Sequence, residues 1–366
     1  MASKQPPRKL LRKRPRSSFH EMTSDDEGDN CSSTGDTNFS NESRPFGALP
    51  KNVSDWTIFD LDKLAIFYDR TAKPTPSDVL QLVTDKTGFY GNLTMEQQEV
   101  MKVITDNLVF DLEIDEENLK QQQYMEGIIT ELRLTEDKLL QKQMEPISSH
   151  KQFMICSYAL DFLTEVKRVI YKMADYNLGK ETVPESFYTS LTSSFARICQ
   201  LTPVPGLLYK TKLQIDTVEV TSIPDLVLEK KKNITSASSV VSIIEVKKAV
   251  ITKAEENKED KDDKKSKADI QHWLSEKVLG QHGGELLLAW NSVETEYVPG
   301  MIAVGTKIYF TLLHISLNHV RTLGPGVADM KEVDKHRATI YYSESKDILV
   351  KDDRNSLIQS VMRLNN

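Results

Sequence analysis

Two short apolar runs near the middle of the chain carry charged residues. Residues 223–228 include Asp225, and residues 240–248 include Glu245 and Lys247. Runs this short and this rich in β-branched residues predict strands. Side chains on a strand alternate between its two faces, so Glu245 and Lys247 are predicted to share one face while the valine between them points into the core. If the two strands pair, all three charged side chains converge.

The pattern around these runs predicts an α/β domain. Apolar residues recur at helical intervals on both sides of the two strands, and further strand-like runs accompany them. The predicted elements are, in chain order, helices at 153–176 and 185–201, a strand at 207–220, a helix at 269–293 that Gly283 and Gly284 interrupt, and strands at 297–305 and 306–315 that turn at Gly305 and Thr306.

The converging residues suit metal and phosphate chemistry. Two carboxylates and the backbone carbonyl of Val246 are hard oxygen ligands of the kind that Mg²⁺ and Mn²⁺ prefer, and Mg²⁺ commonly takes its other ligands from water and phosphate. Lys247 then has two uses. It can stabilise the charge that builds on a phosphodiester, or it can orient the attacking water.

Pro224-Asp225 and Glu245-Val246-Lys247, separated by roughly the length of a β-hairpin, resemble the motif of the PD-(D/E)XK, or restriction-endonuclease-like, nuclease superfamily. The resemblance covers residues 149–315 and implies a nuclease-like domain at 149–366. It implies a mixed sheet flanked by helices, built from a helix, three strands, a second helix and a further strand. It also implies Mg²⁺-dependent hydrolysis of nucleic-acid phosphodiesters, with Asp225, Glu245 and the Val246 carbonyl as metal ligands and Lys247 at the scissile phosphate.

The same resemblance implies two further site residues on the flanking helices. Relatives often supply an acidic residue from the helix before the first strand, and Glu165 or Glu185 fits that place, with Glu165 preferred. Many relatives also carry a glutamine that faces the site from the helix after the E-x-K strand. Gln281 fits best and Gln271 second. Glu285 lies one turn after Gln281 on the same helical face, where it could add a supporting hydrogen bond.

The remaining zones of the chain carry different patterns. Residues 1–50 are polar and are predicted to be disordered, and their basic run at 8–16 is typical of a nuclear-localisation signal or a nucleic-acid-binding arm. The charged segment at 251–268 has no apolar anchor, which predicts a mobile loop. The N-terminal tail and the general character of the sequence resemble those of eukaryotic proteins. A nuclear protein is therefore expected, or otherwise a cytoplasmic one.

Residues 51–148 form a predicted helical region. Helix-like spacing covers 55–70, 76–91, 94–114 and 117–143. Ser77 and Asp78, and Thr94 three residues before Gln97, are candidate capping signals. The region has no dense basic stripe, so we expect it to contact a protein partner or to pack on the following domain.

Composition and net charge argue against some classes of function. The chain has 366 residues and a net charge of −7, which argues against tight sequence-specific DNA binding. Its lysines gather locally, at 210 and 212 and at 230–232 beside the candidate site. No apolar run approaches the length of a membrane span, so no membrane partner is expected. Cys31, Cys156 and Cys199 include no C-x-x-C pair and predict free thiols.

Two functions remain for this sequence, beside the alternative that the chain is an unrelated α/β domain whose charged residues form an ordinary surface ion pair. The first is a metal-dependent nuclease that acts on nucleic acid, with DNA preferred over RNA. The second is a catalytically inactive nucleic-acid-binding or scaffold protein on the same fold. His314 and His319, five residues apart, are expected to have structural rather than metal-binding roles.

Overall fold

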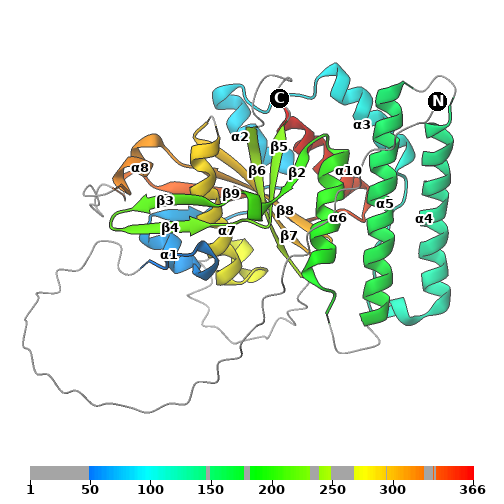
Figure 1. The fold of residues 1–366 in the computed structure, drawn as a ribbon, viewed down its shortest axis with the longest axis horizontal. Coiled ribbons are helices and arrows are strands. Elements are labelled where there is room, and N and C mark those ends of the chain that lie inside the picture. The colour runs from blue at the N-terminus through cyan, green and yellow to red at the C-terminus, as the bar shows by residue number, and fades with distance from the viewer. Residues whose placement is uncertain are drawn as a thin grey trace, which may run out of the picture. The chain divides into compact units, whose positions relative to one another are not determined.

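The computed structural model describes residues 49–145, 149–176, 182–230, 239–248, 268–293, 295–324, 333 and 335–366. Residues from Ser43 onward form one compact unit. Its described part is an α/β arrangement in which helices flank a mixed eight-stranded sheet, as predicted for the fold class (Figure 1). The predictions for the tail before residue 49, with its basic run, and for the charged loop before Ala268 lie outside the described residues.

The main sheet has the strand order β1-β9-β8-β7-β6-β5-β2, and β10 also pairs with β8. Strand β6 is parallel to β7 and β1 is parallel to β9, while the other pairs are antiparallel. The strands of this sheet are β1 (Ile66–Tyr68), β2 (Thr202–Pro205), β5 (Leu226–Lys230), β6 (Ser239–Lys247), β7 (Tyr297–Val304), β8 (Lys307–His314), β9 (Ala338–Tyr342) and β10 (Lys346–Asp347). The two apolar runs of the sequence therefore pair as neighbours, β5 and β6.

The strand predicted at 207–220 is wrong in detail. These residues form a separate hairpin of β3 (Thr211–Ile215) and β4 (Val218–Ser222), and the strand that borders β5 is β2. Strand β2 has two prolines, Pro203 and Pro205, which cannot donate to a sheet ladder. Such a strand is tolerated because β2 lies at the edge of the sheet.

Helices cover both faces of the sheet. The α-helices are α1 (Ile58–Lys63), α2 (Pro76–Thr87), α3 (Met95–Asn107), α4 (Gln122–Gln143), α5 (His150–Tyr176), α6 (Glu185–Ile198), α7 (Glu276–Ala289), α8 (Leu317–Thr322) and α10 (Lys351–Arg363). Short 3-10 turns are η1 (Val53–Asp55), η2 (Asn118–Lys120), η3 (Gly206–Leu208), η5 (Asp269–His272) and η6 (Trp290–Ser292). In Figure 1, α4, α5 and α6 stand side by side on one side of the sheet, and α1 and α7 lie on the other.

Strands β5 and β6 are buried on both faces. Leu226 and Ile244 belong to the core beneath α5 and α6, whereas Val227 and Ile243 belong to the core beneath α1 and α7. A strand that packs on both sides is apolar almost throughout. This explains why both runs are conspicuous in the sequence.

The helical prediction for residues 51–148 needs several corrections, and the helix predicted at 94–114 ends at Asn107 in α3. Of the helix predicted at 55–70, only α1 forms an α-helix. Ile66–Tyr68 instead forms strand β1, which pairs with β9. Helix α2 is capped by Thr75 with Asp78 rather than by Ser77, while the predicted cap of Thr94 with Gln97 starts α3. Apolar residues three and four apart occur in short helices and strands alike, so the pattern alone does not separate them.

A buried arginine ties this region to the C-terminal helix. Arg354 of α10 donates to the carbonyl oxygens of Leu108, Phe110, Ile348 and Leu349 at 2.6–3.1 Å. Its guanidinium also lies 3.9 Å from the centroid of the Phe110 ring. Neither β9 nor α10 was predicted from the sequence.

Other predictions about single residues can now be compared with the structure. His314 stacks on Tyr297, and His319 bonds to two backbone carbonyls, so both have structural contacts. Cys156 and Cys199 are buried free thiols, and Cys31 lies outside the described residues. None of the described helices has the length and apolarity that crossing a membrane requires.

Helix α7 runs unbroken through Gly283 and Gly284, contrary to the predicted interruption. Its glycines instead permit close packing. A Cβ atom at Gly280 would lie 2.2 Å from the carbonyl carbon of Thr57, and one at Gly284 would lie 2.7 Å from the Trp56 ring. The backbone of α7 therefore lies directly against the segment that starts α1.

We predict that Gly280→Ala destabilises the protein by about 1–3 kcal/mol, because the added methyl meets backbone atoms that cannot rotate away. Gly127 is the matched control. It lies exposed in α4, and a Cβ atom there would have nothing within 4 Å, so Gly127→Ala should stabilise by about 1 kcal/mol through helix propensity. Urea unfolding followed by circular dichroism measures both. Equal stability of the two variants would contradict the tight contact between α7 and Thr57.

Candidate functional site

Asp225 lies immediately before the first residue of β5, where β6 extends beyond its pairing with β5. The pairing of β5 with β6 stops at Leu226 opposite Ile244, and the Asp225 carboxylate accepts a hydrogen bond from the next amide of β6, Val246 N–H, at 2.8 Å. The backbone of Asp225 is also fixed, because its carbonyl oxygen accepts a hydrogen bond from Gly206 N–H at 3.0 Å. A side chain thus replaces the missing strand partner.

The carbonyl of Val246 points toward the same place. In a strand, the N–H and C=O of one residue lie on the same edge, which is why paired residues exchange both bonds. Val246 N–H faces Asp225, so its carbonyl does too. The next residue confirms the alternation, because the Lys247 carbonyl accepts from Gly305 N–H on the β7 side at 3.0 Å.

Glu245 and Lys247 share the face of β6 that α7 covers. The Glu245 side chain is fully buried, and its Oε1 is in direct contact with Lys247 Nζ. Lys247 Nζ also lies 4.0 Å from Asp225 Oδ2. One ammonium group therefore joins the two carboxylates, as expected if the two strands pair. The Lys247 and Asp225 side chains keep 26% and 30% of their surface exposed, so solvent reaches this end of the site.

Burial sets the protonation of these groups. It raises the pKa of Glu245 to about 7, with the Asp225 charge adding to the rise and Lys247 opposing it. Burial acts to lower the pKa of Lys247, but the charges of Glu245, Asp225 and Glu185 outweigh it and leave the pKa raised. Lys247 is therefore cationic at neutral pH.

Helix α7 adds a second buried carboxyl group. Glu285 accepts a hydrogen bond from Gln281 Nε2 at 3.1 Å, so the two residues share a helical face as predicted. Burial and the nearby Glu245 charge raise the pKa of Glu285 well above its ordinary value. Glu285 therefore holds a proton more readily than an ordinary glutamate, and its side-chain hydrogen bond with Glu245 lowers the pKa of Glu245.

The acidic residue that accompanies the site is Glu185 and not the preferred Glu165. Glu185 begins α6, accepts a hydrogen bond from the Lys248 backbone N–H, and interacts electrostatically with Lys247 and Asp225. Glu165 instead pairs with Arg168 at 3.7 Å on α5. Sequence spacing cannot separate two glutamates on packed helices, but a position at a helix N-terminus beside a sheet edge was a usable signal for Glu185.

Three other residues depart from expectation. Gln271, the second-choice glutamine, accepts from Ala268 N–H at 2.8 Å and caps η5. His282, which sequence reasoning missed, is buried with a pKa lowered to about 3 by burial and by Lys247, and its Nε2 lies 2.7 Å from Thr311 Oγ1. Lys230 lies at the far end of β5 from Asp225, so it is not beside the site.

The donor set fits a hard divalent cation that keeps water or phosphate ligands. No group of three His, Cys, Asp or Glu side chains placed to hold a metal occurs among the described residues. The set here is two carboxylates and a backbone carbonyl, the sparse protein contribution that Mg²⁺ commonly uses. Both carboxylate oxygens of Glu245 are buried, and the carboxylate contacts the Lys247 ammonium and the Glu285 carboxyl group, so a bound cation would share it with these two neighbours.

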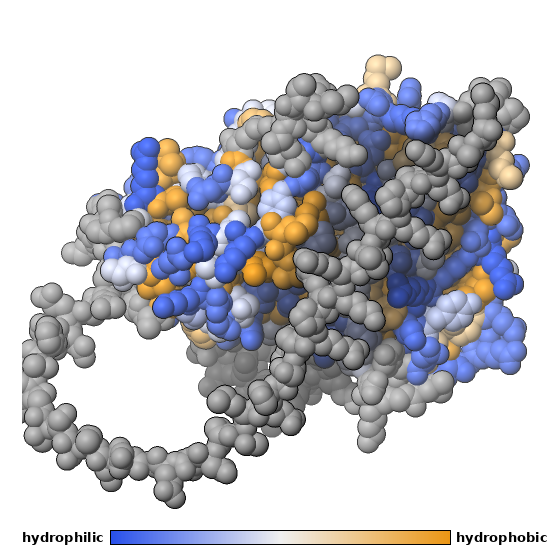
Figure 2. Space-filling view, in the orientation of Figure 1, coloured by the Kyte–Doolittle hydropathy of each residue, from blue (hydrophilic) through white to orange (hydrophobic). Residues whose placement is uncertain are grey.

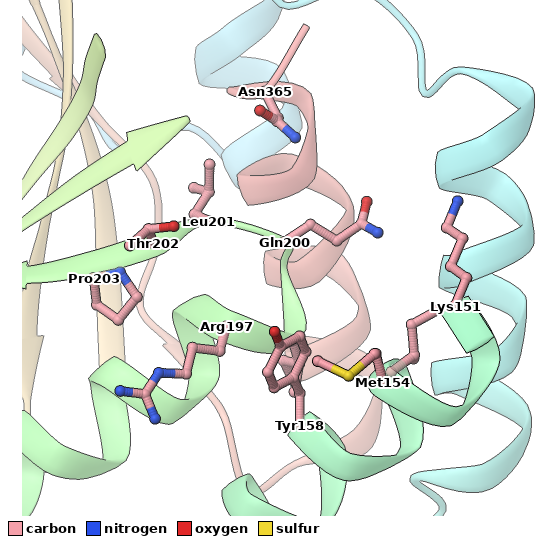
Figure 3. A pocket seen from close by; sticks show the side chains of 11 residues that line it. Lys151, Met154, Tyr158, Arg197, Gln200, Leu201, Thr202, Pro203 and Asn365 are labelled. Carbon is pink, nitrogen blue, oxygen red and sulfur yellow. The ribbon is translucent and has the colours of Figure 1, made fainter. Parts of the chain in front are cut away.

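A different pocket lies away from these residues. It has a volume of about 410 Å³, and Figure 3 shows side chains of α5, the end of α6, β2 and the C-terminus around it, including Tyr158, Arg197 and Asn365. Thr202 and Pro203 of β2, which line it, pair with Glu229 and Leu228, toward the opposite end of β5 from Asp225. None of the residues that line it is acidic, so it offers no carboxylate for a metal.

An apolar patch borders the candidate site. Leu207 and Leu208 of η3 are 82% and 75% exposed, and Ile223, two residues before Asp225, is 45% exposed. Figure 2 shows hydrophobic side chains gathered near the centre of the molecule, where the ends of β2, β4 and β5 meet in Figure 1. The surroundings of Asp225 are therefore apolar on one side and charged on the other.

Comparison of the chain with protein-family models, with curated proteins and with solved structures finds no match.

We predict that Glu245→Gln makes stability less dependent on pH. The pKa of Glu245 is about 7 in the folded protein against an ordinary 4.5, so its stabilising contribution is complete below about pH 4.5 and is lost as the pH rises through 7. This loss amounts to about 3 kcal/mol. Between pH 5.5 and pH 8, the melting temperature should therefore fall several degrees further in the wild type than in the variant.

Differential scanning calorimetry in chelator tests this expectation. Glu99→Gln, on the exposed surface of α3, is the control and should follow the wild type at each pH. Parallel melting curves for wild type and Glu245→Gln would show that Glu245 does not titrate in this range.

Proposed function

We propose that this protein is a metal-dependent nuclease that hydrolyses nucleic-acid phosphodiester bonds, with the site at Asp225, Glu245 and Lys247. The observation that carries the proposal is the convergence of both carboxylates on one lysine ammonium, beside a backbone carbonyl, at a partly open sheet end. A structural ion pair would not need two carboxylates and an open carbonyl around one cation. Phosphodiester hydrolysis uses all of these groups.

The order of elements supports the proposal. Helix α6, strands β2, β5 and β6, helix α7 and strand β7 follow one another along the chain, with the β3–β4 hairpin inserted after β2. This is a helix, three antiparallel strands, a second helix and a further strand, the order that the PD-(D/E)XK resemblance implies. Strand β7 lies parallel to β6, and α7 crosses between them.

Each residue then has a defined task. A divalent cation bound by Asp225, Glu245 and the Val246 carbonyl would activate water and neutralise charge on the scissile phosphate. Lys247 contributes a fixed positive charge to the phosphate, because its raised pKa keeps it protonated and disfavours a role as base. Glu285, which accepts a hydrogen bond from Gln281 and hydrogen-bonds to Glu245, orients the Glu245 carboxylate from α7.

The alternative is a scaffold that binds nucleic acid without cleaving it. The three intact charged residues and the burial of Glu245 favour catalysis, since a scaffold gains nothing from burying a carboxylate with this raised pKa. The helical region at 51–148 shares a core with the sheet, and we propose protein contacts for it only through its outer helices. Nuclear localisation through residues 8–16 is likewise a proposal.

We predict cleavage of DNA or RNA by the purified full-length protein with Mg²⁺ or Mn²⁺, and none in chelator. Asp225→Ala, Glu245→Ala and Lys247→Ala should each lower the rate by about 10²-fold or more, and Gln281→Ala by less. Rates are measured on labelled single-stranded and duplex substrates, with circular dichroism to verify folding. Full activity in Glu245→Ala would place the chemistry elsewhere, and binding without cleavage of every substrate would favour the scaffold.

A second prediction separates the two acidic candidates on the helices. Glu185→Gln removes a charge beside Lys247 and should lower the cleavage rate by about 10-fold or more, as supporting groups of metal sites do. Glu165→Gln is the matched control on the neighbouring helix and should leave the rate within about 2-fold of the wild type. The reverse ranking of these two variants would overturn the assignment of Glu185.

A further inference from the structure

A second pocket lies on the same sheet face and at the same sheet end as Lys247. It has a volume of about 730 Å³ and is lined by side chains that include Asp269, His272, Trp273, Lys307, Tyr309 and Glu344. Its size is within the range of sites that hold a small organic group. Nothing in the proposed chemistry uses these residues.

The strand register connects this pocket to the candidate site. Glu245 pairs with Ile302 of β7, which pairs with Tyr309 of β8, and Lys247 is linked to Lys307 through Val304 in the same way. Residues opposite each other on neighbouring strands point to the same face. Tyr309 and Lys307 therefore stand two strands from Glu245 and Lys247, which is about 10 Å at the usual strand spacing.

Trp273 gives this pocket an aromatic wall. Its indole is 70% exposed, while the other two tryptophans, Trp56 and Trp290, are buried and half-buried. A large aromatic side chain that is exposed to solvent does not gain the stability that its burial would provide. Nucleic-acid-binding proteins use such exposed rings to stack bases. Tyr309 is half-buried in the same pocket and offers a second ring.

The charges around the pocket select a base over a phosphate. Asp269 and Glu344 are both exposed and line it, so an anionic group entering the pocket would be repelled. Carboxylates do accept hydrogen bonds from the amino groups of nucleobases. The exposed ammonium of Lys307, on the side toward Lys247, suits the phosphate that follows the base.

We propose that this pocket receives one unpaired nucleobase of the substrate strand, stacked on Trp273, while the phosphate of a neighbouring nucleotide lies at Lys247. The position of the phosphate rests on the proposed nuclease function. A base inside a duplex is stacked on both sides and cannot enter, so the substrate class is a single strand, or a duplex with an unpaired base at the cleavage position. Cytosine and adenine, which carry amino donors, suit the pocket better than thymine.

The test uses full-length wild-type protein in chelator, so that binding is measured without cleavage. A fluorescein-labelled 20-residue oligo(dC) should bind with anisotropy changes that Trp273→Ala weakens by about 5- to 100-fold and Trp273→Phe largely restores. The tryptophan emission of the wild type should be quenched by oligo(dC), less by oligo(dT), and little by a blunt duplex. Because Trp273 is the exposed tryptophan, the Trp273→Phe protein should lose this quenching.

Phe153→Ala is the matched control, since Phe153 is an aromatic residue on α5 with 47% exposure, and it should bind like the wild type. Unchanged oligo(dC) affinity in Trp273→Ala, or equal quenching by the blunt duplex, would overturn the inference. If the cleavage rate with Mg²⁺ is the same in Trp273→Ala as in the wild type, the nuclease proposal is retained and the base-pocket proposal is rejected. Quenching and Trp273-dependent binding without any cleavage would support the pocket while the catalytic proposal falls.

Discussion

The burial of one carboxylate, that of Glu245, governs the arrangement around it. Strand β6 packs on both faces, so a charged side chain within it has no route to solvent on its own. Its charge is balanced by a lysine two residues along on the same face, and Glu285 of α7 hydrogen-bonds to it. The Glu285 contact needs α7 close to the sheet, and α7 reaches that position through a backbone contact of Gly280 that admits no side chain. The charge and the close packing of the helix thus depend on each other.

The unequal lengths of β5 and β6 create the second half of the site. Beyond the pairing of β6 with β5, the amides of Val246 in β6 and of Lys248 just after it still need acceptors, because unpaired backbone groups are costly when water is excluded. Asp225 and Glu185 supply carboxylates in place of a strand. The same geometry turns the Val246 carbonyl toward them. A structural requirement of the sheet edge therefore gathers negative charge and a backbone oxygen at one point, beside Lys247.

Sequence reasoning succeeded where the information was local. The alternation that places Glu245 and Lys247 on one face, the apolar runs of β5 and β6, and the i, i+4 pair of Gln281 and Glu285 follow from backbone periodicity alone. It failed where distant pairing decides the outcome. Strand β2 contains two prolines and is stabilised by β5, and β1 lies in a segment with helix-like spacing but pairs with β9. The choice between Glu165 and Glu185 likewise depended on which helix end reaches the sheet.

The proposed catalytic residues and the proposed base pocket lie on the same face of the sheet. Because Glu245 and Tyr309 occupy one cross-strand row and Lys247 and Lys307 the next, a change in strand register would move both sets together. The chain has a net charge of −7, so general attraction to a phosphate backbone contributes little to affinity. In the proposed nuclease, binding would then come from local contacts at this face, with a divalent cation, Lys247 and Lys307 at phosphate and Trp273 at a base. Selectivity for unpaired strands would follow from that arrangement, since aromatic stacking is available only to a base that has left its duplex.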